Sequence, residues 1–114
     1  MIEINVQDIG EPSDADVSLI GDLDDAGGKK ARRHLARVVE SGKVNLTIDL
    51  DRVGALNSAG LAALIATLRM ARNRGGEVRV HASKPDVRRI MELTGLSRVF
   101  HLTPAIAAGV APAA

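Results

Sequence analysis

A serine at the expected start of a long helix is the residue of this sequence best suited to chemistry. Ser58 stands at the N-cap or first-turn position after Asn57, and two residues of minimal bulk, Ala59 and Gly60, follow it. Unpaired backbone N–H groups and the positive end of the helix dipole favour an anion there, so the hydroxyl is suited to carry a phosphate. Serine is also among the most favoured N-cap residues. The local pattern therefore leaves two interpretations open, a phosphoacceptor and a simple helix cap.

Hydrolysis by Ser58 would need a neighbouring base, for which the sequence offers His34, His81 and His101. Nothing fixes any of them near Ser58, and the residues around it do not form the Gly-x-Ser-x-Gly elbow of serine hydrolases. His81 ends an expected strand and His34 lies among basic helix residues, so we expect packing or exposure for both. The glycine motifs of dinucleotide sites and P-loops are missing as well. We therefore expect no enzymatic activity.

A phospho-aspartate receiver is a further hypothesis, because the sequence contains an acid pair, a candidate acceptor and a lysine-proline step. These are Asp24 with Asp25, Asp49 or Asp51, and Lys84 followed by proline. A receiver needs two helices and an intervening strand between its acid pair and its acceptor. The chain from Asp25 to Asp49 accommodates one helix and its following strand, which argues against a receiver.

Metal and cofactor sites are not indicated. The chain has no cysteine, which excludes disulfides, zinc–thiolate sites and thiol nucleophiles. Its aspartates and glutamates are scattered without clustered histidine, so no metal-ligand spacing is recognised. Asp22, Asp24 and Asp25 are interpreted as charges at a helix start. We expect neither a metal nor a cofactor.

Charge and aromatic content limit the expected partners. The first 28 residues carry eight acidic and no basic side chains, which leaves 15 basic against 6 acidic in the remainder. The basic stretch from Lys29 to Arg37 is interleaved with apolar residues at helical spacing, as on the exposed face of an amphipathic helix, although an acidic partner or anionic lipid headgroups remain open. Phe100 is the single aromatic residue, so the chain lacks the set of aromatic side chains on which nucleic-acid bases stack. We expect no direct nucleic-acid partner.

The elements that would position Ser58 follow from hydrophobic periodicity. Alternating apolar residues predict strands at 2–6, 44–50 and around Val78 and Val80, and the run 17–20 predicts a hairpin partner for the first strand. Helical spacing predicts a helix that follows the acidic run at 22–25 and extends to about Val39, and a long helix from 57–60 to the glycines at 75–76. A third helix is expected after a capping box at 83–86, burying residues as far as Leu93.

This order predicts the α/β class, with a mixed, partly parallel sheet of four to five strands and helices packed against it. At Val99, Phe100 and Leu102 the sequence indicates either a short last strand, which would be the fifth, or a packed segment. With 114 residues we expect a single domain over 1–114, whose alanine-rich end at 104–114 frays. No apolar run approaches the length of a membrane span and no secretory signal is recognised, so we expect no membrane insertion and a cytoplasmic location. Ligands and partners of such sheets usually bind at the loops that follow parallel strands, here the loops after Ile20 and Leu50.

The chain over 17–102 resembles a STAS domain, the fold of bacterial anti-sigma factor antagonists. The matching pieces, in order, are Gly21-Asp22-Leu23-Asp24, Ile48-Asp49-Leu50, Asn57-Ser58-Ala59-Gly60-Leu61, Gly75-Gly76, and Leu93-Thr94-Gly95-Leu96 with Phe100 downstream. They cover about three quarters of the chain, and the ordered set is more specific than any piece alone. The family commonly has aspartate where this chain has Asn57.

The resemblance implies a regulatory function. In the family, the serine that matches Ser58 is phosphorylated by a partner that is both an anti-sigma factor and a serine kinase; the unphosphorylated form binds that partner and frees the sigma factor. Ser58 is then the phosphoacceptor, and the small residues Ala59 and Gly60 leave room for the partner to approach it. The implied recognition groups beside it are Asn57, Asp22 and Asp24. STAS domains also include non-phosphorylated binding subunits of lipid-transport ABC complexes and of stress-sensing assemblies, which is the alternative.

Overall fold

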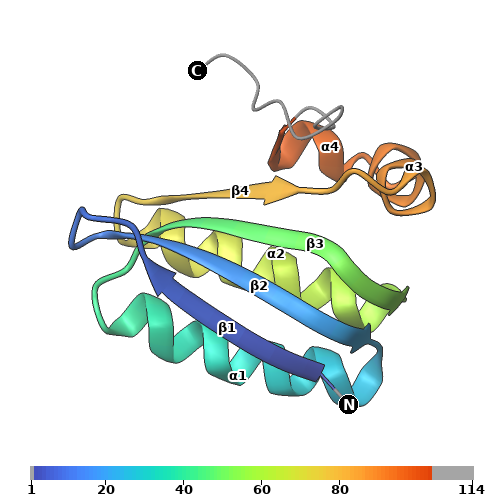
Figure 1. Cartoon of the computed structure of the whole chain (residues 1–114). Helices are drawn as coiled ribbons and strands as arrows, with labels where there is room; N and C mark the ends of the chain where they lie inside the picture. The colour runs from blue at the N-terminus through green and yellow to red at the C-terminus, as the bar shows by residue number, and fades with distance from the viewer. Residues whose placement is uncertain (1, 104–114) are drawn as a thin grey trace.

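The computed structural model describes residues 2–103, so the predicted frayed end at 104–114 lies outside the described residues. The strands are β1 (Ile2–Asp8), β2 (Asp14–Leu23), β3 (Asn45–Leu56), β4 (Glu77–His81) and β5 (His101–Thr103). The helices are α1 (Asp25–Glu40), α2 (Ser58–Asn73), α3 (Pro85–Leu93) and α4 (Leu96–Val99). Figure 1 shows α1 and α2 side by side along one face of the sheet.

The five strands form one sheet in the order β1-β2-β3-β4-β5. β1 pairs with β2 antiparallel, and the remaining neighbours are parallel. The predicted α/β class, with a partly parallel sheet and an antiparallel first strand, is confirmed. Because β2 and β3 are parallel neighbours, the loops that follow them emerge at the same edge of the sheet.

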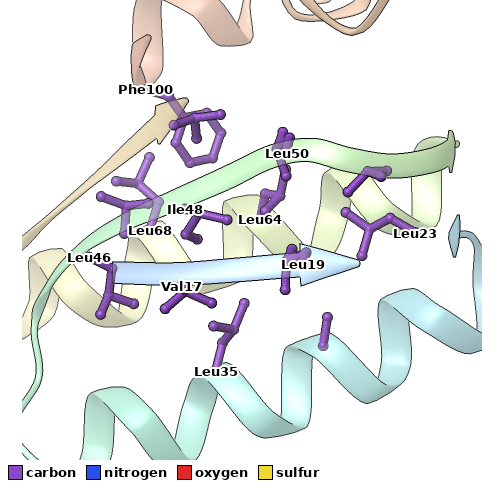
Figure 2. Packing of buried hydrophobic residues seen from close by; sticks show 14 of the residues in the cluster. Val17, Leu19, Leu23, Leu35, Leu46, Ile48, Leu50, Leu64, Leu68 and Phe100 are labelled. Atoms are coloured by element: carbon purple, nitrogen blue, oxygen red, sulfur yellow. The ribbon is translucent and has the colours of Figure 1, made fainter. Parts of the chain in front are cut away.

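The core lies between the sheet and the two long helices (Figure 2). Alternate residues of β2 and β3 point into it, among them Val17, Leu19, Ile48 and Leu50, each fully buried. Leu35 of α1 and the leucines of α2 pack against them, as the 3.6-residue periodicity predicts. In the described part of the chain, no helix combines the length and apolar character needed to cross a bilayer.

Several local predictions were wrong. β2 and β3 extend to Leu23 and Leu56, well beyond the ends that alternation indicated. The register between them shifts twice, which breaks the strict alternation on which the prediction relied. Leu93 is 76% exposed instead of buried, because α3 ends there. The short last strand is confirmed by β5, but Val99 ends the short helix α4 instead of joining that strand, and Phe100 is buried.

The predicted capping box at the start of α3 is also wrong. The N-cap is Lys84, which makes no side-chain cap hydrogen bond. The backbone N–H of Ser83 instead donates to Asp51 Oδ1 at 2.7 Å, which ties the turn before α3 to β3. Proline in the first turn of this helix is confirmed by Pro85.

Candidate functional site

Ser58 is the first residue of α2, and its hydroxyl is not used as a cap. The N-cap is Asn57, whose Oδ1 accepts hydrogen bonds from the N–H groups of Ala59 (3.0 Å) and Gly60 (3.2 Å). Ser58 is exposed. Within residues 2–103 no side-chain hydrogen bond engages its hydroxyl. Of the two interpretations of Ser58, the simple helix cap is therefore wrong.

The loops after β2 and β3 meet, as their parallel pairing predicts. The N–H of Asn57 donates to the carbonyl oxygen of Leu23 at 3.4 Å, and its Nδ2 donates to Asp25 Oδ1 at 3.2 Å. Nearby, the N–H of Ala55 donates to Asp22 Oδ1 at 3.0 Å. These bonds hold the starts of α1 and α2 together at one edge of the sheet.

The start of α1 is acidic. Asp24 caps this helix by accepting from the N–H of Gly27 at 2.9 Å, and Asp25 occupies its first turn. The predicted helix-start role is confirmed for Asp24 and Asp25 but wrong for Asp22, which lies in β2 and accepts the N–H of Ala55. Asp22 is exposed at the end of β2, whereas Asp24 is half-buried. Recognition by Asp22 and Asp24 stays a prediction, and Asp22 has the more accessible side chain.

Gly60 has an internal packing role. A Cβ atom at this position would collide with the backbone carbonyl oxygen of Leu23, so only glycine lets α2 approach β2 this closely. Gly27 has the same relation to the carbonyl oxygen of Asp22. Gly60 is buried and Ala59 is half-buried. The predicted approach of a partner over these two residues is untested, and the exposure of Ala59 suits it better than that of Gly60.

A shallow hollow of about 330 Å³ runs from this site between α1 and α2. Its wall from α1 contains Asp25, Lys29 and Arg32, and its wall from α2 is made of alanines. Lys29 and Arg32 are exposed while Ala31 and Leu35 are buried, which confirms that the basic stretch forms the exposed face of an amphipathic helix. The surface beside Ser58 is therefore acidic toward β2 and basic along α1.

A second polar cluster was missed by the sequence analysis. Asp49, Asp51 and His81 each bring a potential metal-ligand atom within 4.8 Å of the others. The expectation that no histidine clusters with the carboxylates is therefore wrong. The i, i+2 spacing of the two aspartates was visible in the sequence, but their approach to His81 depends on the register of β3 against β4, which pairs Asp49 with His81.

The environment of Asp51 lowers the pKa of its carboxyl group. Burial raises the pKa of Asp51, but hydrogen bonds from Ser83 and the nearby His81 outweigh burial, so the pKa lies below its ordinary value of 3.8. His81 Nε2 lies 3.0 Å from Asp51 Oδ2. The half-buried His81 is thus engaged with a carboxylate.

The receiver hypothesis gains no support from these contacts. Lys84, its candidate lysine, donates from Nζ to the carbonyl oxygen of Val53 at 2.9 Å. Asp24 is committed to capping α1. The site that best fits the sequence prediction is therefore the start of α2.

Comparisons with known proteins concern the family and the fold of the chain. A family model described as the STAS domain matches residues 4–109. The anti-sigma-B factor antagonist of Bacillus subtilis (strain 168) is 26% identical over 109 residues, which cover 96% of this chain and 99% of that protein. The crystal structure of an anti-sigma factor antagonist from Mycobacterium paratuberculosis has a TM-score of 0.81 and 32% identity, and the match covers 93% of this chain and 88% of the other.

A more distant match concerns the fold alone. The Bacillus cell fate determinant SpoIIAA, solved in its phosphorylated form, has a TM-score of 0.68 at 14% identity. The match covers 90% of this chain and 92% of SpoIIAA. Sequence and architecture thus resemble the same group of proteins over nearly the whole chain.

Proposed function

The chain belongs to the STAS domain family, and we propose that it is an anti-sigma factor antagonist whose binding is switched by phosphorylation of Ser58. The unphosphorylated chain binds an anti-sigma factor at the start of α2 and so releases a sigma factor for transcription. The relatives at 26% and 32% identity support this function, since both are anti-sigma factor antagonists. The proposed role is that of a binding protein, without enzymatic activity of its own.

The observation that carries the proposal is the exposed, uncommitted hydroxyl of Ser58. A kinase must reach its acceptor, and a residue used as a cap would have to break a hydrogen bond first. Asn57 satisfies the N–H groups of Ala59 and Gly60, so Ser58 is free of that task. A phosphate on Ser58 would lie at the positive end of the α2 dipole, which favours an anion.

Phosphorylation would change the charge of this surface far more than its shape. A phosphoserine adds about −1.5 to −2 charges at neutral pH. The first turn of α2 contains no acidic residue, whereas Asp25 lies within hydrogen-bond distance of Asn57. The added charge would join that of Asp25 and Asp22 and repel an acidic partner surface. A hundredfold loss of affinity requires only about 2.7 kcal/mol, which a desolvated like-charge contact supplies.

The residues around Ser58 have distinct proposed roles. Asn57 and Asp22 are exposed and flank the acceptor, so they are the proposed contacts of the partner, with Ala59 at the edge of the same surface. Asp24 and Gly60 act mainly through the local fold, one as a cap and the other as a close packing point. Asp22→Asn keeps the oxygen that accepts the N–H of Ala55, so it should change binding with little effect on stability.

The partner is proposed to be an anti-sigma factor that also phosphorylates Ser58. Incubation of the chain with this partner, Mg²⁺ and ATP, followed by intact-mass analysis, should show the addition of one phosphate. Ser58→Ala should abolish the addition. Ser41→Ala is the matched control, because Ser41 is also exposed but lies at the C-terminal end of α1 and donates to the carbonyl oxygen of Val38. No added phosphate, or a phosphate that persists in Ser58→Ala, would refute the switch.

The same variants separate a switch from constitutive binding. The switch predicts that Ser58→Ala keeps its affinity for the anti-sigma factor and that Ser58→Asp loses most of it. A permanent subunit of a transport or sensory assembly predicts equal binding by both variants. Calorimetric titration of the partner into each variant distinguishes the two functions.

A further inference from the structure

The cluster of Asp49, Asp51 and His81 lies apart from Ser58, and the register of the sheet creates it. Asp49 and Asp51 flank the fully buried Leu50, so their side chains emerge on the sheet face opposite the core. His81 is the direct neighbour of Asp49 on β4. Two adjacent strands therefore present three potential ligand atoms to one point, all within 4.8 Å of one another.

Backbone hydrogen bonds hold one oxygen of each carboxylate. Asp49 Oδ1 accepts from the N–H of Asp51 at 2.8 Å, and Asp51 Oδ1 accepts from the N–H of Ser83 at 2.7 Å. The second oxygen of Asp51 lies 3.0 Å from His81 Nε2. The backbone thus orients both carboxylates, as neighbouring hydrogen bonds commonly do for metal ligands.

An ion pair between His81 and Asp51 does not account for Asp49. His81 Nε2 contacts one oxygen of Asp51, and Asp49 forms no ion pair within residues 2–103. The group is half-buried: the side chains of His81 and Asp51 are 15% and 30% exposed. A divalent cation that replaces the imidazole proton would neutralise both carboxylates and accept the lone pair of Nε2.

We propose that Asp49, Asp51 and His81 bind a zinc-like divalent cation, which fastens β3 to β4 and to the turn before α3. An imidazole nitrogen among the ligands favours zinc or cobalt over calcium and magnesium, which prefer oxygen alone. Tetrahedral zinc places its donors about 3.4 Å apart, so a cluster this compact needs only small side-chain movements. Water completes the coordination, as in other sites with three protein ligands.

Titration of the metal-free chain with Zn²⁺, and separately with Co²⁺, tests the site. We expect one ion per chain, a visible absorption band from four-coordinate Co²⁺, and a higher midpoint of thermal unfolding with Zn²⁺. His81→Gln should weaken binding by at least about tenfold, and Asp49→Asn should do the same, which a mere His81–Asp51 ion pair would not require. His34→Gln is the matched control, since it removes a half-buried histidine outside the cluster.

A wild-type measurement keeps the test independent of the folding of the variants. Co²⁺ is paramagnetic, so it should broaden the amide signals of Asp49, Asp51 and His81 before those of α1. Failure of the wild-type chain to bind either ion at millimolar concentration would overturn the proposal. Equal losses in His81→Gln and His34→Gln, or broadening centred elsewhere, would also overturn it, because the binding would then be adventitious. None of these outcomes depends on Ser58 or on an anti-sigma factor.

Discussion

The two long helices begin side by side and in nearly the same way, yet they carry different charge. α1 starts with Asp24-Asp25-Ala26-Gly27 and α2 with Asn57-Ser58-Ala59-Gly60. In each, the side-chain oxygen of the first residue accepts the N–H of the glycine. In each, the glycine lies too close to a carbonyl oxygen of β2 to be replaced by a larger residue. The caps are an acid and an amide with the same acceptor oxygen, whereas the second residues differ in function, an acid in α1 and a serine that can be phosphorylated in α2.

This difference separates the requirements of the fold from those of regulation. The cap and the glycine are needed to join each helix to the end of β2. The residue after the cap is exposed in both helices, so packing does not dictate its identity. At α1 this position always carries a charge, whereas at α2 a charge can be added by phosphorylation and removed again.

The glycines should give the largest effect on stability. Gly60→Ala and Gly27→Ala each place a Cβ against a backbone carbonyl oxygen, so the helix start must move. We expect each variant to lower the free energy of unfolding by about 3 kcal/mol, toward the upper end of the usual cost of overpacking. Urea denaturation monitored by circular dichroism measures the change.

Gly54→Ala is the control for these glycines. Its Cβ would meet only the side-chain Oδ1 of Asp22 at 2.7 Å, which can rotate away. It should therefore cost clearly less than Gly60→Ala. Equal costs at the three positions would mean that the close approach of the helices to β2 is not the reason for glycine.

Loss of a cap should have an intermediate effect. Asp24→Ala and Asn57→Ala each leave N–H groups of a first turn without their acceptor. A loss of about 1 kcal/mol in the free energy of unfolding is expected for each. Asn57→Asp retains the acceptor oxygen and should remain within a few tenths of a kcal/mol of the wild type. If Asn57→Ala proved neutral, Ser58 would be able to act as the N-cap. The assignment of capping to Asn57 and of phosphorylation to Ser58 would then be wrong.

The sequence predicted the helices and the sheet well because their periodicity is local. The sequence also placed Ser58 at the start of the helix. Asn57 and Ser58 are both favourable N-cap residues, so only the hydrogen bonds in the structure show that Asn57 is the cap. The true ends of β2 and β3 could not be predicted, since the register shifts between them interrupt alternation. The cluster of Asp49, Asp51 and His81 was hidden for a related reason: a contact across strands depends on register, which composition and spacing do not specify.

Exchange of the residues after the caps should affect stability only slightly. Asp25→Ser removes a favourable charge from the start of α1 and should cost about 0.5 kcal/mol. Ser58→Asp gains a similar interaction with the α2 dipole, but the nearby Asp25 opposes it, so the net change should stay below about 0.5 kcal/mol. Thermal unfolding of both variants measures this. A large destabilisation in Ser58→Asp would mean that any loss of binding reflects misfolding.

The smallest effect is expected at Asp51, which lies away from both helix starts. Its pKa is lower in the folded chain than its ordinary value of 3.8. The stabilisation that it contributes is therefore complete above that value and is lost as the pH falls through the folded pKa. In the presence of a chelator, Asp51→Asn should lose less stability than the wild type between about pH 5 and pH 2. Parallel stability curves for the two chains would contradict this account.

The affinity of the anti-sigma factor for the chain with and without phosphate on Ser58 tests the central claim most directly. A chain with phosphoserine incorporated at position 58 and the unmodified chain can be titrated with the same partner by calorimetry. The predicted result is tight binding of the unmodified chain and a loss of about a hundredfold on phosphorylation, with unchanged thermal stability. Equal affinity of the two forms would show that Ser58 is not a switch.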